Sequence, residues 1–409
     1  MAKKIFQRLF VAIILVLVIQ IVRVMLDKAS PMSILYHSSL LNVLRMLLII
    51  WLLLATLLDI IFRKSTKVKR TGWLSFGIIA LIITVGELFS VSWVNHPGRI
   101  PGGLLQGYRL LYAHNLTNVI QVIPECSEYD SSLYYNLKPN NSCTFTNIEF
   151  SNPYTTNSSG LRDDDSSLQR PEVICLGDSY MMGWGVNQQE TVAAVLESMT
   201  GKKVLNAAMS SFGTAREVKR LKVLDTAAMK YLVIQYCPND NEENKAWEDN
   251  QGHLPISSRA SYDSLKGKSD WNKKYFPGKY FIIATTHLLK EKIKSMLGKP
   301  PSIIGLPVEP KRDAKMFLDI LKTAPVDMQK TKIILFEGVE LAHVNDAFIK
   351  EVNGLLQEPA YKSHFADRLV IVNLTGILDK SDYYIFDGHL KPTGHRKIAA
   401  EIARFMQER

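Results

Sequence analysis

The sequence predicts an α/β fold, a flavodoxin-like three-layer sandwich with a five-stranded parallel sheet, preceded by three transmembrane helices. Two observations support this prediction. Three apolar stretches near the N-terminus of the 409-residue chain approach or exceed the roughly 20 residues that a helix needs to cross a bilayer. From residue 171 onward, short apolar runs alternate with helix-length segments, which is typical of a parallel sheet covered by helices on both faces.

The three apolar stretches lie at about 9–24, 40–62 and 73–94. The first is the shortest, and a basic start followed by a short apolar run also describes a signal peptide. We interpret it as an anchor, because no small-x-small cleavage site follows it and two stronger spans come soon after. Residues 1–94 are therefore expected to form a membrane region.

Charge sets the expected orientation of this membrane region. Residues 1–94 carry eleven Lys or Arg against three Asp or Glu, which is +8 of the net charge of +10. Five of the eight residues in 63–70 are basic, and Lys3, Lys4 and Arg8 precede the first span. The positive-inside rule assigns both segments to the cytoplasm and everything after residue 94 to the other side. Because the basic residues belong to the membrane region, we expect no nucleic-acid surface.

Two charged residues inside the expected spans need partners. Arg45 lies about five residues from the outer end of its span and Glu87 about seven from the outer end of its own, so they share a depth. One expectation is that they pair, since an isolated charge in lipid is costly. The alternative is that Arg45 reaches the outer headgroups while Glu87 lines a helix interface.

The segment 95–168 is rich in Asn, Ser, Tyr and Pro, and we expect a juxtamembrane β-containing linker or collar. An oxidising compartment would permit a disulfide between Cys126 and Cys143, but the sequence leaves this pairing open. Cys175 and Cys237 lie in apolar strand-like runs and are expected to be buried free thiols. The CxxC and HxxxH spacings of zinc sites are absent, so we expect no metal, and no cofactor motif stands out.

The globular domain is expected at 169–409, with an insertion at about 241–310. Five apolar or β-branched runs are the expected strands, at 173–176, 204–205, 231–236, 332–336 and 369–372. The insertion is aromatic and basic and includes a helical stretch at 280–297. Insertions of this kind usually carry lids or substrate specificity.

Candidate site residues follow the strands of the predicted sheet. Ser179 follows the first strand within a Gly-Asp-Ser run, and a Ser-Ser-Phe-Gly run at 210–213 follows the second. Asn239 follows the third strand, and an Asp387-x-His389 pair follows the fifth. In an open α/β sheet the ligand crevice lies beyond the carboxyl ends of the strands, so these segments should meet there. A serine becomes a nucleophile when a histidine, fixed by a carboxylate, takes its proton.

These four blocks, in this order, resemble the SGNH hydrolase superfamily, also called GDSL-type esterases, over about residues 171–409. The resemblance implies that Ser179 is the nucleophile and that its backbone N–H is one oxyanion donor. It also implies that His389 is the general base and Asp387 its carboxylate partner.

The resemblance also assigns the other donors of the oxyanion hole. Asn239 matches the family's third-block asparagine, whose side-chain amide donates. The glycine of the family's second block falls on Ser211, which is a departure from the pattern, and Gly213 is the fallback donor. Fixed donors of this kind stabilise the negative charge that acyl transfer builds on a carbonyl oxygen.

Neighbouring residues have plainer interpretations. In an extended segment residues two apart point to the same side, so Asp387 and His389 could touch directly, although many family members space this pair by three. Asp178 is expected to shape the turn, and His395 to belong to the start of the last helix. The G-x-S-x-G motif is missing, which argues against the α/β-hydrolase fold.

The function that these features predict is a membrane-tethered serine esterase or O-acyltransferase acting through a covalent acyl-serine. The resemblance alone implies the substrate, an ester, in particular an acetyl ester, of a cell-envelope glycan or lipid. The expected location is the cytoplasmic (inner) membrane, with the C-terminal domain extracytoplasmic, which is periplasmic in a Gram-negative cell. A transferase would need an acyl-donating membrane partner unless a soluble ester supplies the acyl group. The alternative is a catalytically inactive glycan-binding or scaffolding module, which the departure at Ser211 and the large insertion favour.

Overall fold

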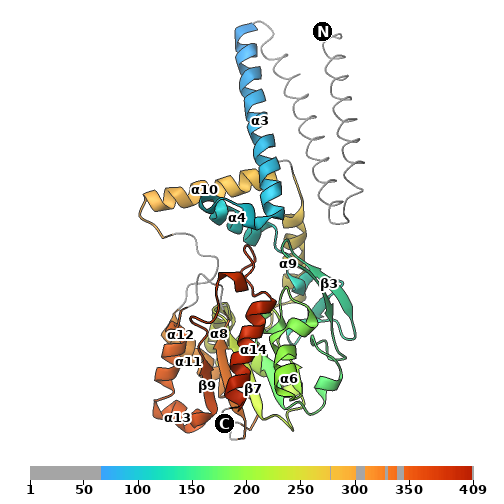
Figure 1. Ribbon diagram of the computed structural model, residues 1–409, viewed down its shortest axis with the longest axis vertical. Helices are drawn as coiled ribbons and strands as arrows, with labels where there is room; N and C mark the ends of the chain where they lie inside the picture. Colours follow the sequence, from blue (N-terminus) through green and yellow to red (C-terminus); the bar gives the residue numbers. More distant parts are fainter. Residues whose placement is uncertain (1–65, 277, 301–308, 328–329, 339–344, 408–409) are drawn as a thin grey trace. The chain divides into compact units, whose positions relative to one another are not determined.

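The computed structural model describes residues 66–276, 278–300, 309–327, 330–338 and 345–407 (Figure 1). The expected spans at 9–24 and 40–62, and Arg45 with them, lie outside these residues. The chain divides into two compact units, which are described separately. The first comprises the described residues of 1–111 and 273–301, and the second those of 112–272 and 302–409.

The first unit is helical. It holds α3 (Thr66–Asn95), most of α4 (Gly102–Asn115) and α10 (Lys279–Met296), and α10 packs against α3. Within the described residues, one helical stretch is long and apolar enough to cross a membrane, Gly77–Asn95. This stretch covers most of the third expected span at 73–94 and ends one residue beyond it, and 22% of it is buried in the structure.

A five-stranded parallel sheet forms the centre of the second unit, as the sequence predicts. Its strands are β5 (Val173–Leu176), β6 (Val204–Asn206), β7 (Tyr231–Tyr236), β8 (Lys332–Glu337) and β9 (Leu369–Val372). Their order is β6-β5-β7-β8-β9, and every neighbouring pair is parallel. This is the 2-1-3-4-5 order of flavodoxin-like sheets, in which the order of adding strands reverses between the first and third strands and leaves a crevice at their carboxyl ends.

Helices cover this sheet in two groups. In one group α6 (Val192–Thr200) packs against α14 (Pro392–Gln407). In the other, α11 (Pro310–Leu321) packs against α7 (Thr214–Arg220), α8 (Asp240–Asp249) and α12 (Ala347–Leu355). The strand β5 between them is buried at all four positions, which explains its uninterrupted apolar sequence. Short helices α5 (Ser179–Met182) and α13 (Pro359–Phe365) and the longer α9 (Arg259–Lys273) complete the unit.

Two small antiparallel hairpins precede the sheet in the chain. They are β1 (Ser127–Asp130) with β2 (Tyr134–Leu137), and β3 (Ser142–Thr146) with β4 (Ser151–Thr155). From Tyr112 onward the segment expected as a collar belongs to the same compact unit as the sheet. Its apolar side chains join the core of that unit.

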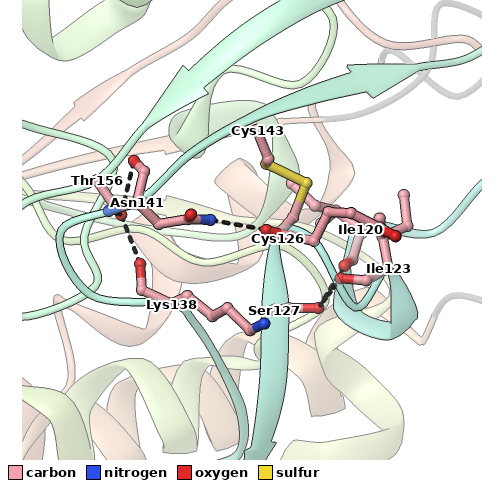
Figure 2. The surroundings of a disulfide bond; sticks show 9 residues. Ile120, Ile123, Cys126, Ser127, Lys138, Asn141, Cys143 and Thr156 are labelled. Carbon is pink, nitrogen blue, oxygen red and sulfur yellow. Dashed lines mark hydrogen bonds between the residues drawn. A yellow bond between two sulfur atoms is a disulfide. The ribbon is translucent and has the colours of Figure 1, made fainter.

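A disulfide between Cys126 and Cys143 joins the two hairpins (Figure 2). The two Cα atoms are 5.4 Å apart, within the usual range for a disulfide. Figure 2 also shows the side-chain hydrogen bonds around it: Ser127 Oγ donates to the carbonyl of Ile120 at 2.6 Å, and Thr156 Oγ1 to that of Lys138 at 2.6 Å. The pairing that the sequence left open is therefore made.

The insertion at 241–310 is largely helical among its described residues. It contains most of α8, then α9 and α10. The helix expected at 280–297 corresponds to α10, which belongs to the first unit and not to the unit that holds the sheet.

Candidate active site

The candidate nucleophile lies in a tight turn at the carboxyl end of β5. Gly177 has φ = +152°, and a Cβ there would lie 2.5 Å from Gln235 Oε1, so the turn requires glycine. Asp178 caps the short helix α5, because its side chain accepts a hydrogen bond from the N–H of Tyr180 at 3.0 Å. Ser179 is therefore the first residue of a helix that starts at the sheet edge.

Ser179, His389 and Asp387 form a continuous line of hydrogen bonds. Ser179 Oγ lies 2.7 Å from His389 Nε2, and His389 Nδ1 lies 2.5 Å from Asp387 Oδ1. The Asp387 carboxylate can only accept a hydrogen bond, so the proton of the neutral His389 ring is assigned to Nδ1. Nε2 is then the acceptor for the hydroxyl of Ser179. This is the geometry that a serine hydrolase needs to activate its nucleophile.

The contact between Asp387 and His389 arises from a turn, not from an extended strand as the two-residue spacing suggested. The turn is closed by a bridge between Tyr383 and Leu390 and by a hydrogen bond from Tyr384 N to the carbonyl of His389 at 2.9 Å. Gly388, between the acid and the base, has φ = +76°. Other residues rarely adopt this left-handed conformation, so the glycine allows the two side chains to meet.

Aromatic rings hold the imidazole of His389 in place. The Tyr180 ring lies 4.7 Å from it and the Trp184 ring 4.9 Å, with the Trp184 ring tilted by only 21° from the imidazole plane. The His389 side chain keeps 20% of its surface exposed. The base is therefore oriented by its neighbours but still reachable from solvent.

Asp387 is held as a carboxylate. Its side chain is 2% exposed, and Tyr112 donates a short hydrogen bond to the oxygen that His389 does not use. Burial acts to raise the pKa of Asp387, but the His389 ring and the hydrogen bonds from His389 and Tyr112 outweigh it, so the pKa lies below its usual range. Burial and the charge of Asp387 raise the pKa of Tyr112 well above its ordinary value, so this phenol remains a donor.

Glu149 fixes the backbone of the segment that carries Asp387. Its carboxylate accepts hydrogen bonds from three successive N–H groups, those of Ile385 at 2.8 Å, Phe386 at 2.7 Å and Asp387 at 3.0 Å. Burial raises the pKa of Glu149, although these three donors counteract it. Glu149 lies between β3 and β4, in the hairpin that the disulfide anchors. The catalytic acid is thus positioned by a residue 238 positions away in the chain.

Asn239 lies beside the nucleophile turn. Its side-chain amide donates one hydrogen bond to Asp178 Oδ2 at 3.0 Å. An amide nitrogen carries two hydrogens, and the side chain of Asn239 donates this one alone to the residues that the structure describes, so the second can serve a substrate oxygen. Asp178 therefore shapes the turn, as expected, and also orients the candidate oxyanion donor.

Ser211 occupies a conformation that suits glycine. Its φ is +59°, in the left-handed region, which explains why the resembled family has glycine here. Its N–H makes no hydrogen bond to any residue that the structure describes. Gly213, the fallback donor, instead bonds through its N–H to Glu243 Oε1 at 3.2 Å. Of the two, Ser211 alone has an uncommitted backbone donor.

Several residues that support the site escaped the sequence analysis. Arg162 is fully buried and donates to the carbonyls of Met182, Gly183 and Val186, which follow the nucleophile. Tyr135 donates from its hydroxyl to the carbonyl of Ser210, next to the candidate oxyanion donor. These residues, like Tyr112 and Glu149, lie in the segment read as a collar, and no sequence motif marks them.

The remaining candidates lie in the core. His395 is 1% exposed, and burial lowers its pKa to about 3, so it is a neutral core histidine. Cys175 and Cys237 are buried free thiols, as expected. Among the described residues, no group of three His, Cys, Asp or Glu side chains is arranged to hold a metal ion. A hollow of about 570 Å³, lined in part by Asp163, contains none of the candidate catalytic residues.

No family model and no curated protein matches this chain. Among solved structures it is similar to a candidate lipolytic protein of the G-D-S-L family from Desulfitobacterium hafniense DCB-2 (12% identity, TM-score 0.27, covering 57% of this chain and 97% of that one). It is also similar to an acetyl xylan esterase from the rumen bacterium Butyrivibrio proteoclasticus (11% identity, TM-score 0.33, covering 58% of this chain and 63% of that one). A third similar structure is a candidate GDSL-like lipase from Bacteroides ovatus ATCC 8483 (10% identity, TM-score 0.34, covering 76% of this chain and 88% of that one). Identities and TM-scores this low do not decide function, which is inferred from the geometry of the site.

Proposed function

We propose that this protein is a membrane-tethered serine hydrolase of the SGNH type that cleaves or transfers an acyl group through a covalent intermediate on Ser179. The observation that carries the proposal is the hydrogen-bonded line from Ser179 through His389 to Asp387. A nucleophile, a base and an orienting acid in contact are the parts that acyl transfer needs, whatever the family.

The reaction begins when Ser179 Oγ attacks the carbonyl carbon of an ester. His389 Nε2 takes the hydroxyl proton, and Asp387 stabilises the imidazolium that forms. The carbonyl oxygen becomes negatively charged and would accept hydrogen bonds from the N–H groups of Ser179 and Ser211 and from the amide of Asn239. Loss of one such donor typically costs about 3–4 kcal/mol of transition-state stabilisation.

The proton on His389 then passes to the leaving alcohol, which departs and leaves an acyl-serine. In the second half, His389 deprotonates an acceptor hydroxyl, which attacks the acyl carbon and releases Ser179. Water as the acceptor gives an esterase, and a sugar or lipid hydroxyl gives an O-acyltransferase. The proposed substrate is an acetyl ester of a cell-envelope glycan or lipid on the extracytoplasmic side of the membrane.

An inactive scaffold is the competing proposal, and the site geometry speaks against it. A scaffold would tolerate a separated Ser179 and His389, whereas they lie 2.7 Å apart. The serine at position 211 does not argue for a scaffold either. Its backbone adopts the left-handed conformation that glycine would take, so its N–H keeps the conformation of the glycine that it replaces.

The test is labelling of the full chain, in detergent or nanodiscs, with a serine-reactive fluorophosphonate. We expect labelling that disappears in Ser179→Ala and falls steeply in His389→Gln, while Ser264→Ala, a change at an exposed serine of α9, labels normally. Labelling that survives Ser179→Ala, or absent labelling in the folded wild-type chain, would overturn the proposal. A panel of short-chain aryl esters and acetylated glycans, with and without acceptor sugars, then separates hydrolysis from transfer.

A further inference from the structure

Helix α10 carries an apolar stripe that faces away from the rest of its unit. Five large apolar residues lie at helical spacing and are exposed: Ile282 (41%), Leu289 (59%), Ile293 (48%), Met296 (80%) and Leu297 (66%). Positions three, four and seven apart share one face of a helix, so the four residues from Leu289 to Leu297 form a continuous apolar surface. Ile282 lies on the same face one repeat earlier, beyond the exposed Thr285 and Thr286. A stripe of this kind needs a partner, because a water-facing helix normally presents polar residues there.

The opposite face of α10 packs within the unit. The Phe281 ring lies against Gly86 of α3, where a Cβ would come within 2.5 Å of the ring. Ala284 is 1% exposed, and Leu288 packs against Gly107 of α4. The contacts that hold α10 in the unit therefore use a face other than the stripe, and Figure 1 shows α10 running sideways from α3, which it meets at one end.

Glu87 fixes the start of α10 at a defined level of α3. Its carboxylate accepts hydrogen bonds from the N–H groups of Phe281 at 2.8 Å and Tyr280 at 3.3 Å, and from the Tyr275 hydroxyl at 2.5 Å. A carboxylate at a helix N-terminus satisfies N–H groups that lack an intrahelical partner. Arg45, the partner once expected for Glu87, is outside the described residues. Glu87 lies eight residues before the end of α3 at Asn95, or about 12 Å along the helix axis.

Lysines flank the stripe. Lys290 and Lys292 are exposed, lie on either side of the line from Leu289 to Ile293, and make no ion pair with any residue that the structure describes. Lys299, just beyond the helix, is exposed as well. An apolar stripe bordered by lysines is the pattern of helices that lie in the plane of a membrane surface, with the stripe in the acyl chains and the lysines on anionic headgroups.

We propose that α10 is an interfacial membrane helix whose stripe contacts lipid at the surface of the bilayer that α3 crosses. This inference rests on the membrane insertion of α3 within the proposed function, and is independent of the hydrolase chemistry. A bilayer is favoured over a protein partner because α10 packs against the same unit's apolar helix α3, which itself exposes Ile82 (54%) and Phe89 (56%).

Site-specific fluorescence in liposomes tests the proposal. The free thiols Cys175 and Cys237 are buried, so a cysteine introduced at Met296→Cys, Ile82→Cys or Val223→Cys can be labelled selectively, with the parent chain measuring background. Each full-length variant is reconstituted with lipids that carry a nitroxide either near the headgroup or near the chain end, and is also titrated with aqueous iodide. Val223, 79% exposed in the second unit, is the water-facing control.

The expected result is that the Met296 probe is quenched several-fold more by the headgroup-proximal nitroxide than the Val223 probe, and less by iodide. The Ile82 probe should respond best to the deeper nitroxide. Charge reversal by Lys290→Glu with Lys292→Glu should weaken Met296 quenching in anionic vesicles and leave Ile82 quenching unchanged.

Three results would overturn the proposal. Iodide quenching of the Met296 probe equal to that of the Val223 probe, with the Ile82 probe still in lipid, would show that α10 faces water although α3 is inserted in the membrane. A Met296 probe shielded from both quenchers would show that protein covers the stripe. An Ile82 probe that is not in lipid would show that α3 does not cross the membrane. That result would not affect the Ser179-dependent labelling, which tests the hydrolase chemistry separately.

Discussion

Replacing Glu149 by alanine should disable the site although Ser179, His389 and Asp387 themselves remain unchanged. The carboxylate accepts three backbone hydrogen bonds, at 2.7 to 3.0 Å, from the segment that ends in Asp387. Alanine leaves these N–H groups without an acceptor in a half-buried place. An unsatisfied buried donor costs about 1–3 kcal/mol, and water can reach some of these donors, so we expect destabilisation of about 1–3 kcal/mol in total.

The catalytic loss should exceed the loss of stability. Once the segment relaxes, Asp387 no longer holds the His389 ring in position against Ser179. A displacement of a catalytic group by about 1 Å can lower the rate about 100-fold. The ceiling is the loss of the acid altogether, about 10⁴-fold in kcat. We therefore expect Glu149→Ala to lower kcat and the rate of fluorophosphonate labelling by about 100-fold, with a small change in KM.

Labelling rate and thermal unfolding, measured on the same full-length preparations, separate positioning from folding. Glu149→Gln keeps one acceptor oxygen of the same reach and should restore much of the rate. Glu128→Ala removes an exposed glutamate of β1 and should behave as wild type. A Glu149→Ala variant that labels at the wild-type rate would refute the reasoning, and so would equal losses in the alanine and glutamine variants.

Three further predictions concern the same unit. Tyr112→Phe removes the second hydrogen bond to Asp387, and since bonds to charged groups contribute about 1.5–3 kcal/mol, the labelling rate should fall by about tenfold or more while the protein still folds; an unchanged rate would count against this role. Ser211→Gly should keep at least the wild-type labelling rate because the backbone already has φ = +59°, whereas Ser211→Val should lower the melting temperature, and equal behaviour of the two variants would contradict this. His395, whose pKa burial lowers to about 3, folds in its neutral form, so its contribution to stability is full above its unfolded pKa of about 6.5 and is lost as the pH falls toward 3. Chemical denaturation between pH 7 and pH 4 should show wild type losing stability faster than His395→Gln, by up to about 1.4 kcal/mol per pH unit, and parallel curves would refute it.

The sequence by itself determined the sheet and the chain order of the site. Runs such as 231–236 are apolar at nearly every position, which marks strands buried on both faces, and the structure confirms all five. Because parallel strands end at one edge, the positions of Ser179 and of the Asp387-Gly388-His389 run sufficed to predict that they meet. Local pattern carries this information, since strand formation and strand-end turns depend on neighbours in the sequence.

Only the tertiary structure decided what holds the site in place. Glu149 and Tyr112 reach Asp387 from segments more than 200 residues away, and no periodicity or motif records a contact between such distant positions. The left-handed backbone at Ser211 and the turn around Gly388 depend likewise on how their loops pack. A hydrogen bond between distant residues is a property of the folded chain, so the segment that looked like a collar proved to carry the supports of the candidate active site.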